Sequence, residues 1–371
     1  MTPKRPEGAG AIPKSVESPA LSSPGPANLY AALDLGTNSC RMLIAQPQGS
    51  QFVVVDSFSK SVQLGAGLER SGRLSRSSIY RTIQALRVCQ QKLKRNRVTR
   101  MRLVATEACR RASNGGEFMA RVRRETGLHL DIIEPQEEAQ LAVVSCAPLV
   151  SRKTDQLLVV DIGGGSTELV WIDLTNVPPA ERPKSIMRMH NGFHSSDGSS
   201  PAAKVVDWIS VPLGVATLRD QFNDVEDDSA RFALMSWFFE ENLAEFAPYK
   251  DEPPREGFQI VGTSGTVTTV AASHLGLKRY DRNKVDGLRM TSDEIDKVIR
   301  SYLALGPTGR RRDPRIGMDR QALIMSGAAI LQALLRCWPT DRLSVADRGL
   351  REGMLYAQMS EDGVLTDEEH E

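Results

Sequence analysis

The chain carries one short pattern twice, and this repeat constrains the fold more than any other feature of the sequence. Residues 32–44 read ALDLGTNSCRMLI, and residues 159–171 read VVDIGGGSTELVW. Aligned at an offset of 127 residues, an aspartate, a glycine and a serine coincide, and apolar residues flank them in both copies. Two apolar runs around a glycine turn predict a β-hairpin. A hairpin that recurs at a domain-length interval predicts two copies of one α/β domain with a ligand cleft between them. Chance similarity of two short patterns is the alternative.

The rest of the chain supplies the other elements of two such domains. Hydrophobic periodicity predicts strands at 51–55, 101–105, 132–133 and 259–261, and helices at 75–95, 137–147, 228–246, 292–305 and 319–336. We expect a disordered, proline-rich leader at 1–29, an N-terminal domain at 30–136 and a second domain at 137–348. A flexible insertion is expected at 176–203, and a C-terminal segment with an acidic tail at 349–371.

Composition excludes several classes of protein. Lysine and arginine (47) nearly balance aspartate and glutamate (46), so net charge indicates neither a membrane nor a specific nucleic-acid partner. Five cysteines without a C-x-x-C pair argue against a disulfide framework or a zinc site, and predict a reducing, cytoplasmic location. The longest uncharged apolar stretch, residues 321–335, is shorter than the roughly 20 residues of a membrane span.

Charge is distributed unevenly along the chain. Residues 81–124 hold thirteen basic and two acidic side chains, a local net charge of +11 that would concentrate polyanions. Few aromatic residues interleave with them, which does not favour single-stranded nucleic acid. A solvated basic face balanced by acids elsewhere is the alternative. His190 and His194 lie in the glycine- and serine-rich stretch and do not indicate a metal site.

The two repeated turns have the chemistry of a phosphate site. Glycine lets a backbone approach a ligand closely, and successive amides in a tight turn form an anion-binding concavity. Asp34 and Asp161 would face each other across the cleft and hold a hard cation such as Mg²⁺ together with phosphate oxygens. The amides and hydroxyls that would contact phosphate belong to Thr37, Asn38, Ser39, Gly164, Gly165, Ser166 and Thr167. Two ordinary tight hairpins are the alternative.

A third turn and two isolated side chains are also candidates. The turn formed by Gly262, Thr263, Ser264, Gly265 and Thr266 follows a strand and suits a phosphate or nucleotide at a helix N-terminus, or simply a close strand-to-helix connection. The chain lacks the P-loop, Rossmann and G-x-S-x-G motifs, so those readings lose support. Glu138 suits a general base and Arg110 a phosphate clamp. In isolation, however, a carboxylate favoured by the helix dipole and an ordinary surface arginine explain these two residues better.

In these and further motifs, the sequence resembles the exopolyphosphatase/guanosine pentaphosphate phosphohydrolase (Ppx/GppA) family, a branch of the actin–hexokinase–Hsp70 superfamily. The matching motifs are ALDLGTNSCR (32–41), ATEACR (105–110), EEA (137–139), DIGGGSTE (161–168), VGTSGT (261–266), PLG (212–214) and GLREG (349–353). They extend from about residue 30 to residue 355, over nearly all of the expected ordered chain. The resemblance implies two RNase H-like domains with an interdomain active-site cleft.

The resemblance also implies roles for individual residues. Glu138 is expected to be the catalytic base, and Asp34, Asp161 and Glu168 the ligands of Mg²⁺, with Mn²⁺ as an alternative ion. Arg41, Arg110 and Gly163 join the phosphate-binding residues of the two turns. The implied reaction is hydrolysis of a terminal phosphoanhydride, which distinguishes the chain from the sugar or acetate kinases of the superfamily.

The substrate stays open at this stage. The basic segment favours inorganic polyphosphate, and hence an exopolyphosphatase that releases orthophosphate. Guanosine pentaphosphate hydrolysis and a non-catalytic alarmone or polyphosphate sensor are the alternatives, and a homodimer is left open. The chain lacks the helical C-terminal domains of long family members, so we expect a short form.

Overall fold

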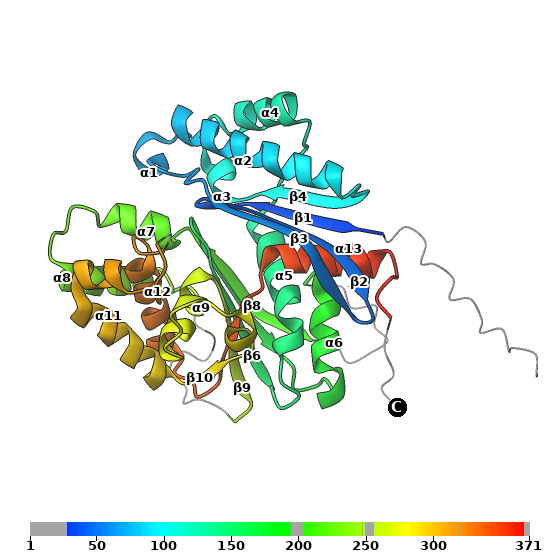
Figure 1. Ribbon diagram of the computed structural model, residues 1–371. Coiled ribbons are helices and arrows are strands. Elements are labelled where there is room, and N and C mark those ends of the chain that lie inside the picture. The colour runs from blue at the N-terminus through cyan, green and yellow to red at the C-terminus, as the bar shows by residue number, and fades with distance from the viewer. Residues whose placement is uncertain (1–27, 194–202, 247, 249–255, 319, 367–371) are drawn as a thin grey trace, which may run out of the picture.

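The computed structural model describes residues 28–193, 203–246, 248, 256–318 and 320–366, which form two lobes, each built on a β-sheet (Figure 1). The first sheet has the order β3-β2-β1-β4-β5. Its strands are β1 (Tyr30–Leu35), β2 (Ser39–Gln48), β3 (Gln51–Ser61), β4 (Arg100–Ala105) and β5 (Asp131–Ile132). β1, β2 and β3 pair antiparallel, whereas β4 and β5 continue the sheet in parallel with β1.

The second sheet repeats this arrangement and adds one edge strand. Its order is β10-β11-β9-β6-β7-β8. The strands are β6 (Gln156–Ile162), β7 (Thr167–Asp173), β8 (Lys204–Val211), β9 (Phe258–Thr263), β10 (Arg289–Met290) and β11 (Leu343–Ala346). β6, β7 and β8 pair antiparallel, and β9 and β11 run parallel to β6. Both hairpins predicted from the repeat are present at equivalent places, so the expected α/β fold of two RNase H-like domains is confirmed.

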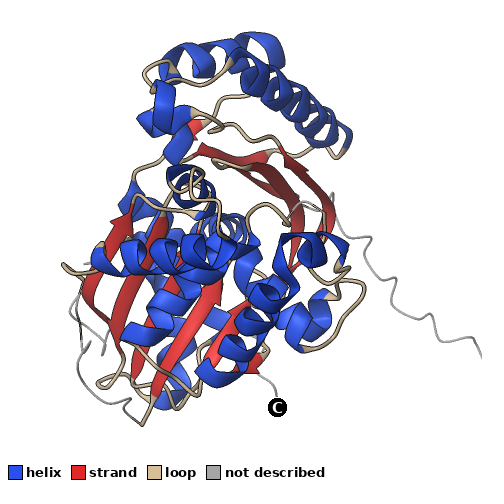
Figure 2. Ribbon diagram, turned by 90° about the vertical axis from the view of Figure 1, so that its left-hand side faces the viewer, coloured by secondary structure: helices blue, strands red, loops and turns tan. Residues whose placement is uncertain are grey.

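Helices cover both faces of the sheets (Figure 2). On the first lobe, α2 (Arg76–Arg95) and α4 (Gly115–Thr126) cover the outer face, with α1 (Leu68–Ser71) and α3 (Glu107–Arg111) beside them. On the second lobe, α7 (Val215–Gln221), α8 (Asp228–Glu241), α9 (Gly265–His274), α11 (Ser292–Arg312) and α12 (Ile324–Cys337) form the outer layer, with α10 (Arg282–Val285) at one end. Within the described ranges, no helix has both the length and the apolar character needed to cross a bilayer.

Two helices lie between the sheets (Figure 1). α5 (Pro135–Cys146) follows the strands of the first lobe, yet its Ala139 and Val143 pack in the hydrophobic cluster of the second sheet. α13 (Leu350–Glu361) is last in the sequence, yet its Met354 and Met359 pack on the first sheet. Each lobe is therefore completed by a helix that reaches it from the other.

Strand alternation directs the repeated aspartates toward this inner layer. In β1, Asp34 shares a face with Ala32, which packs against α13, because alternate residues of a strand point the same way. In β6, Asp161 shares a face with Val159, which packs against α5. Both carboxylates thus point to the space between the lobes, at the ends of their strands.

Two segments are more ordered than the sequence suggested. Within the expected flexible insertion at 176–203, residues 179–191 form two 3-10 turns, η2 (Pro179–Glu181) and η3 (Arg188–Asn191), around helix α6 (Arg182–Met187). Gln140 of α5 holds this segment by donating to the backbone carbonyls of Met189 and His190, at 2.7 Å each. That anchor lies 49 residues away in the chain, so local periodicity could not show it. Residues 194–202 lie outside the described part.

The C-terminal end is also anchored rather than frayed, at least to residue 366. The Tyr30 hydroxyl donates to Asp362 at 2.9 Å, and the Thr366 amide donates to the Gly49 carbonyl at 3.1 Å. These contacts come from the first lobe, far away in the sequence. The leader at 1–27 and the last five residues lie outside the described ranges.

The close approach of α13 to α5 yields a stability prediction. A Cβ on Gly353 would lie 2.0 Å from the Leu141 carbonyl oxygen, so Gly353→Ala must push the two helices apart. We expect a loss of about 2 kcal/mol in the free energy of unfolding, measured in urea. Gly116→Ala in α4 is the matched control, because a Cβ there meets nothing within 4 Å. It should be neutral or stabilising by about 0.5 kcal/mol. Equal stability of the two variants would contradict the packing described.

Candidate active site

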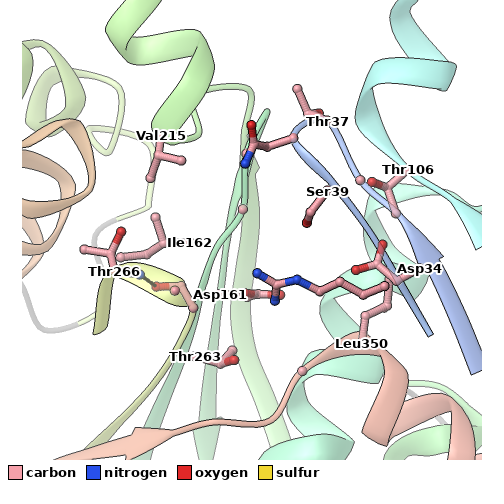
Figure 3. Close-up of a pocket in the computed structure, with 18 of the residues that line it drawn as sticks. Asp34, Thr37, Ser39, Thr106, Asp161, Ile162, Val215, Thr263, Thr266 and Leu350 are labelled. Atoms are coloured by element: carbon pink, nitrogen blue, oxygen red, sulfur yellow. Dashed lines mark hydrogen bonds between the residues drawn. The ribbon is translucent and has the colours of Figure 1, made fainter. Parts of the chain in front are cut away.

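The lobes enclose a cleft at the carboxyl ends of β1, β6, β9 and β11, the usual position of a ligand in α/β sheets. Figure 3 shows Asp34, Thr37 and Ser39 on the first-lobe side, opposite Asp161 and Ile162. The predicted site residues that line it are Asp34, Thr37, Asn38, Ser39, Arg41, Glu138, Asp161, Gly163, Gly164, Gly165, Ser166, Thr263, Ser264, Gly265 and Thr266. Four predicted residues do not line it, namely Arg110, Thr167, Glu168 and Gly262.

The two repeated turns touch each other across the cleft. A Cβ on Gly165 would lie 2.4 Å from the Thr37 hydroxyl oxygen, and one on Gly164 would lie 3.3 Å from the Thr37 Cβ. A Cβ on Gly214, at the start of α7, would lie 2.5 Å from the Gly164 carbonyl carbon. A larger residue at Gly165 would push the two turns apart, and one at Gly214 would push α7 away from the Gly164 turn, so close backbone approach explains the glycines at these two positions. The Thr37 hydroxyl is buried there without a hydrogen-bond partner among the described residues.

The side chain of Thr167, at the end of the second turn, bonds to the chain itself. Its hydroxyl donates to the Leu213 carbonyl at 2.8 Å, and the side chain is fully buried. Alternation along β7 turns it away from the cleft, so it ties the turn to the segment before α7 rather than facing a ligand.

Four carboxyl groups lie in and beneath the cleft and influence one another. Burial raises the pKa of Asp34, and burial together with the charges of Glu168 and Asp34 raises the pKa of Asp161 well above its usual value. Burial, then the charge of Glu168, raises the pKa of Glu138 in the same way, and Arg110 partly opposes this effect. Burial raises the pKa of Glu168 to about 7, although the Ser210 hydroxyl donates to its Oε1 at 2.8 Å.

These carboxylates are the residues that could hold a metal. Glu168 Oε2 is buried and has no hydrogen-bond partner in the described part of the chain, and a cation would relieve the mutual repulsion that raises the pKa values. The described residues nevertheless contain no cluster of three or more histidine, cysteine, aspartate or glutamate side chains placed to bind an ion. Asp34, Asp161 and Glu168 therefore do not form a ready-made metal centre. The donor set fits Mg²⁺, which commonly takes one or two carboxylates and completes its shell with phosphate and water oxygens.

Arg110 lies behind the cleft instead of lining it. Its Nη2 donates to Glu107 Oε2 at 2.7 Å, and its Nη1 donates to the Ile133 carbonyl. Both of these nitrogens also approach Glu138 Oε2, at 3.3 and 3.4 Å. The guanidinium of Arg110 thus neutralises the charges of Glu138, the expected base, and of Glu107. Its role as a phosphate clamp stays a prediction.

The third turn also differs from the prediction in part. Ser264 caps α9, because its hydroxyl accepts from the amides of Thr266 and Val267 at 3.0 and 3.1 Å. A Cβ on Gly265 would lie 0.9 Å from Arg320 Nη1, so the guanidinium fills the space that glycine leaves. This turn therefore makes room for Arg320 beside the cleft. The first amides of α9 already donate to the Ser264 hydroxyl.

The basic segment at 81–124 lies elsewhere. Most of it forms α2 and α4 on the outer face of the first lobe (Figure 1), and none of its described basic residues lines the cleft. Acids from outside the segment neutralise part of it. Glu125 pairs with Arg87 and Arg121, and Asp56 pairs with Lys92 and Arg95. The local charge therefore does not favour a long polyanion at this site.

Several lining residues received no role from the sequence. They are Thr106, Glu107, Arg320, Asp347, Arg348 and Arg351, together with Ser59 and Ser61 at the end of β3. Glu107 and Arg351 stand inside motifs that carry the family resemblance, which is the only signal that pointed to them. Arg320 precedes α12 without any motif, and only the fold brings it to Gly265.

Two RNase H-like lobes whose glycine turns meet beside buried carboxylates define a protein that handles phosphate groups between its domains. A sequence model of the Ppx/GppA phosphatase family matches residues 43–362. The chain belongs to the Ppx/GppA phosphatase family, as its motifs predicted, and is accordingly a hydrolase of the phosphatase type.

Solved structures agree with this assignment. The Ppx/GppA family member of Aquifex aeolicus is 29% identical, with a TM-score of 0.70, over 91% of this chain and 99% of that one. An exopolyphosphatase-like protein is 26% identical, with a TM-score of 0.71, over 88% of this chain and 97% of its own. An exopolyphosphatase from Cytophaga hutchinsonii has a TM-score of 0.74 over 91% of this chain and 98% of its own, and at 20% identity it supports the fold alone.

The raised pKa of Glu168 predicts how stability depends on pH. Between the ordinary value of 4.5 and about 7, the folded chain keeps a proton on Glu168 that the unfolded chain has lost. The free energy of unfolding contributed by this group is therefore present at low pH and is lost as pH rises through about 7. Relative to wild type, Glu168→Gln should gain about 3 kcal/mol between roughly pH 4 and pH 8, measured by urea unfolding in EDTA. If the free energy of unfolding of the two proteins changed with pH in the same way, the raised pKa of Glu168 would be wrong.

Proposed function

We propose that this protein is an exopolyphosphatase that hydrolyses the terminal phosphoanhydride of inorganic polyphosphate and releases orthophosphate with Mg²⁺. The observation that carries the proposal is the position of Glu138. This carboxylate, 9% exposed, lines the cleft in which the two glycine turns meet, and its pKa is raised by burial and by Glu168. A base whose pKa is shifted toward neutral pH is suited to take a proton from water.

The proposed reaction uses the residues of both lobes. The turns that contain Asn38 and Gly164 would hold the terminal phosphate with backbone amides. Glu138 would take a proton from a water molecule as that water attacks the terminal phosphorus, and the shortened chain would leave with the bridging oxygen. Asp34, Asp161 and Glu168 would hold Mg²⁺. Bound there, the ion supplies charge neutralisation at the phosphoanhydride oxygens.

The lining of the cleft supports polyphosphate over a nucleotide. None of the described lining residues is aromatic, so the site offers no ring on which a guanine base would stack. Four arginines line it, namely Arg41, Arg320, Arg348 and Arg351, against five carboxylates, namely Asp34, Glu107, Glu138, Asp161 and Asp347. That balance suits a polyanion that arrives with divalent cations. The exopolyphosphatase-like relative at 26% identity points the same way.

Orthophosphate release from long-chain polyphosphate, guanosine pentaphosphate and ATP, measured side by side, tests the proposal. We expect polyphosphate to be the preferred substrate, and Glu138→Gln to lower turnover at least ~100-fold while the fold is retained. Glu137→Gln is the matched control, because the neighbouring carboxylate pairs with Arg102 in a half-exposed contact outside the cleft lining. It should keep turnover within about threefold. If guanosine pentaphosphate were the preferred substrate, the protein would be a guanosine pentaphosphate phosphohydrolase instead. Binding of polyphosphate or guanosine pentaphosphate without turnover would indicate a sensor.

Metal dependence gives a separate test. EDTA should abolish turnover, and added Mg²⁺ should restore it. Asp161→Asn should raise the Mg²⁺ concentration for half-maximal activity at least ~10-fold, because a neutral amide binds the ion more weakly. Asp131→Asn serves as the control, since that side chain is 58% exposed on the short strand β5. An unchanged Mg²⁺ requirement in Asp161→Asn would remove this carboxylate from the proposed site.

A further inference from the structure

Glu107 is a buried carboxylate to which neither the motifs nor the proposed reaction gives a role. It is the first residue of α3, is 7% exposed and lines the cleft. Its Oε2 accepts from Arg110 Nη2 at 2.7 Å, and its Oε1 lies 3.6 Å from Arg111 Nε. An acidic side chain facing a phosphate site would repel the substrate, so these two arginines are needed to neutralise it.

The contacts of Arg110 show what Glu107 does. The Glu107 ion pair is shorter than the contacts of Arg110 with Glu138, which are 3.3 and 3.4 Å long. The Ile133 carbonyl holds the same guanidinium from a third direction. Arg110 is therefore fixed mainly by Glu107 and Ile133, and it stands beside Glu138 without closing into a tight pair.

The position of Glu107 also depends on the second lobe. A Cβ on Gly165 would lie 2.9 Å from Glu107 Cγ and 3.3 Å from its Cβ. The glycine turn after β6 thus packs directly on the Glu107 side chain from across the cleft. Glu107 touches the opposite lobe on one side and Arg110 on the other.

We propose that Glu107 is a positioning residue, which fixes Arg110 at the edge of Glu138 when the lobes are together and so sets the orientation of the base. Without its charge, Arg110 is free to form a short charge-assisted pair with Glu138, which would occupy the carboxylate that must accept a proton from water. The inference rests on the proposed function, in which Glu138 is the base.

The test is steady-state hydrolysis of polyphosphate with Mg²⁺ by Glu107→Gln in the full chain. We expect kcat to fall at least ~10-fold with KM within about threefold, because the substrate contacts stay in place while the base is misplaced. Glu69→Gln is the matched control. Glu69 holds Arg111 at 2.6 Å in a half-exposed pair and does not touch Arg110, so its loss should change kcat less than about twofold.

A double-mutant cycle separates positioning from general stabilisation. If Glu107 acts through Arg110, then adding Glu107→Gln to Arg110→Met should lower kcat by less than about twofold. Glu107→Asp is measured in parallel, because it keeps the charge that supports folding but withdraws the carboxylate by one methylene. It should show the same loss of kcat as Glu107→Gln.

Each outcome decides a different point. Wild-type kcat in Glu107→Gln and Glu107→Asp overturns the positioning role, and so does a full further loss in the Arg110→Met background. A wild-type protein that releases no orthophosphate from any phosphoanhydride overturns the proposed function, and the positioning role with it. An active wild type with an unaffected Glu107→Gln overturns the positioning role alone.

Discussion

The structure depends on carboxylates that two lobes bring to one cleft. Asp34 reaches it from β1, Asp161 from β6 and Glu138 from α5, and each has a raised pKa because burial and like charges oppose ionisation. Such an arrangement is costly unless protons or a cation compensate it. In the proposed site, a divalent ion that brings phosphate oxygens with it would relieve this repulsion. The repulsion between these buried carboxylates would then explain both their electrostatic cost to the folded protein and the proposed affinity of the cleft for a metal-bound phosphate substrate.

The repeat explains how a fold with internal similarity makes an asymmetric site. In the first hairpin Asp34 stands opposite Arg41, and at the equivalent place in the second hairpin Asp161 stands opposite Glu168. One lobe therefore presents a carboxylate beside a guanidinium, and the other presents two carboxylates. The contact between the glycine turns brings Asp34, Arg41 and Asp161 to one cleft, whereas Glu168 lies buried beneath it. Glu138 enters from α5, which belongs in sequence to the first lobe and in packing to the second.

Local sequence patterns were sufficient to predict the two α/β domains and part of the candidate active site. Alternating apolar residues and glycine turns predicted both hairpins, and the Asp–Gly–Ser repeat placed Asp34 and Asp161 on facing lobes. The family motifs added Glu138, which spacing alone left open. Contacts between residues far apart in the sequence could not be predicted from local patterns. Gln140 orders the segment around α6, and Arg320 fills the space over Gly265. Asp56 and Glu125 neutralise part of the charge of the basic helices. The phosphate role of Arg110 stays a prediction, and its contacts with Glu107 and Glu138 could not be predicted, because a motif gives the identity of an arginine but not the carboxylates that hold it.

Proton release on metal binding measures directly how many of the cleft carboxyl groups ionise to hold the ion. Titration of Mg²⁺ into the protein with a non-hydrolysable diphosphate, by calorimetry in buffers of different ionisation enthalpy near pH 6, counts the protons that leave as the ion binds. Because the cleft carboxyls have raised pKa values and a ligating carboxylate must be ionised, the account predicts release of about one proton or more per ion. It also predicts that this release diminishes in Asp161→Asn. Tight binding of Mg²⁺ without proton release in any buffer would contradict the proposal that buried, mutually repelling carboxyl groups ionise to bind the cation.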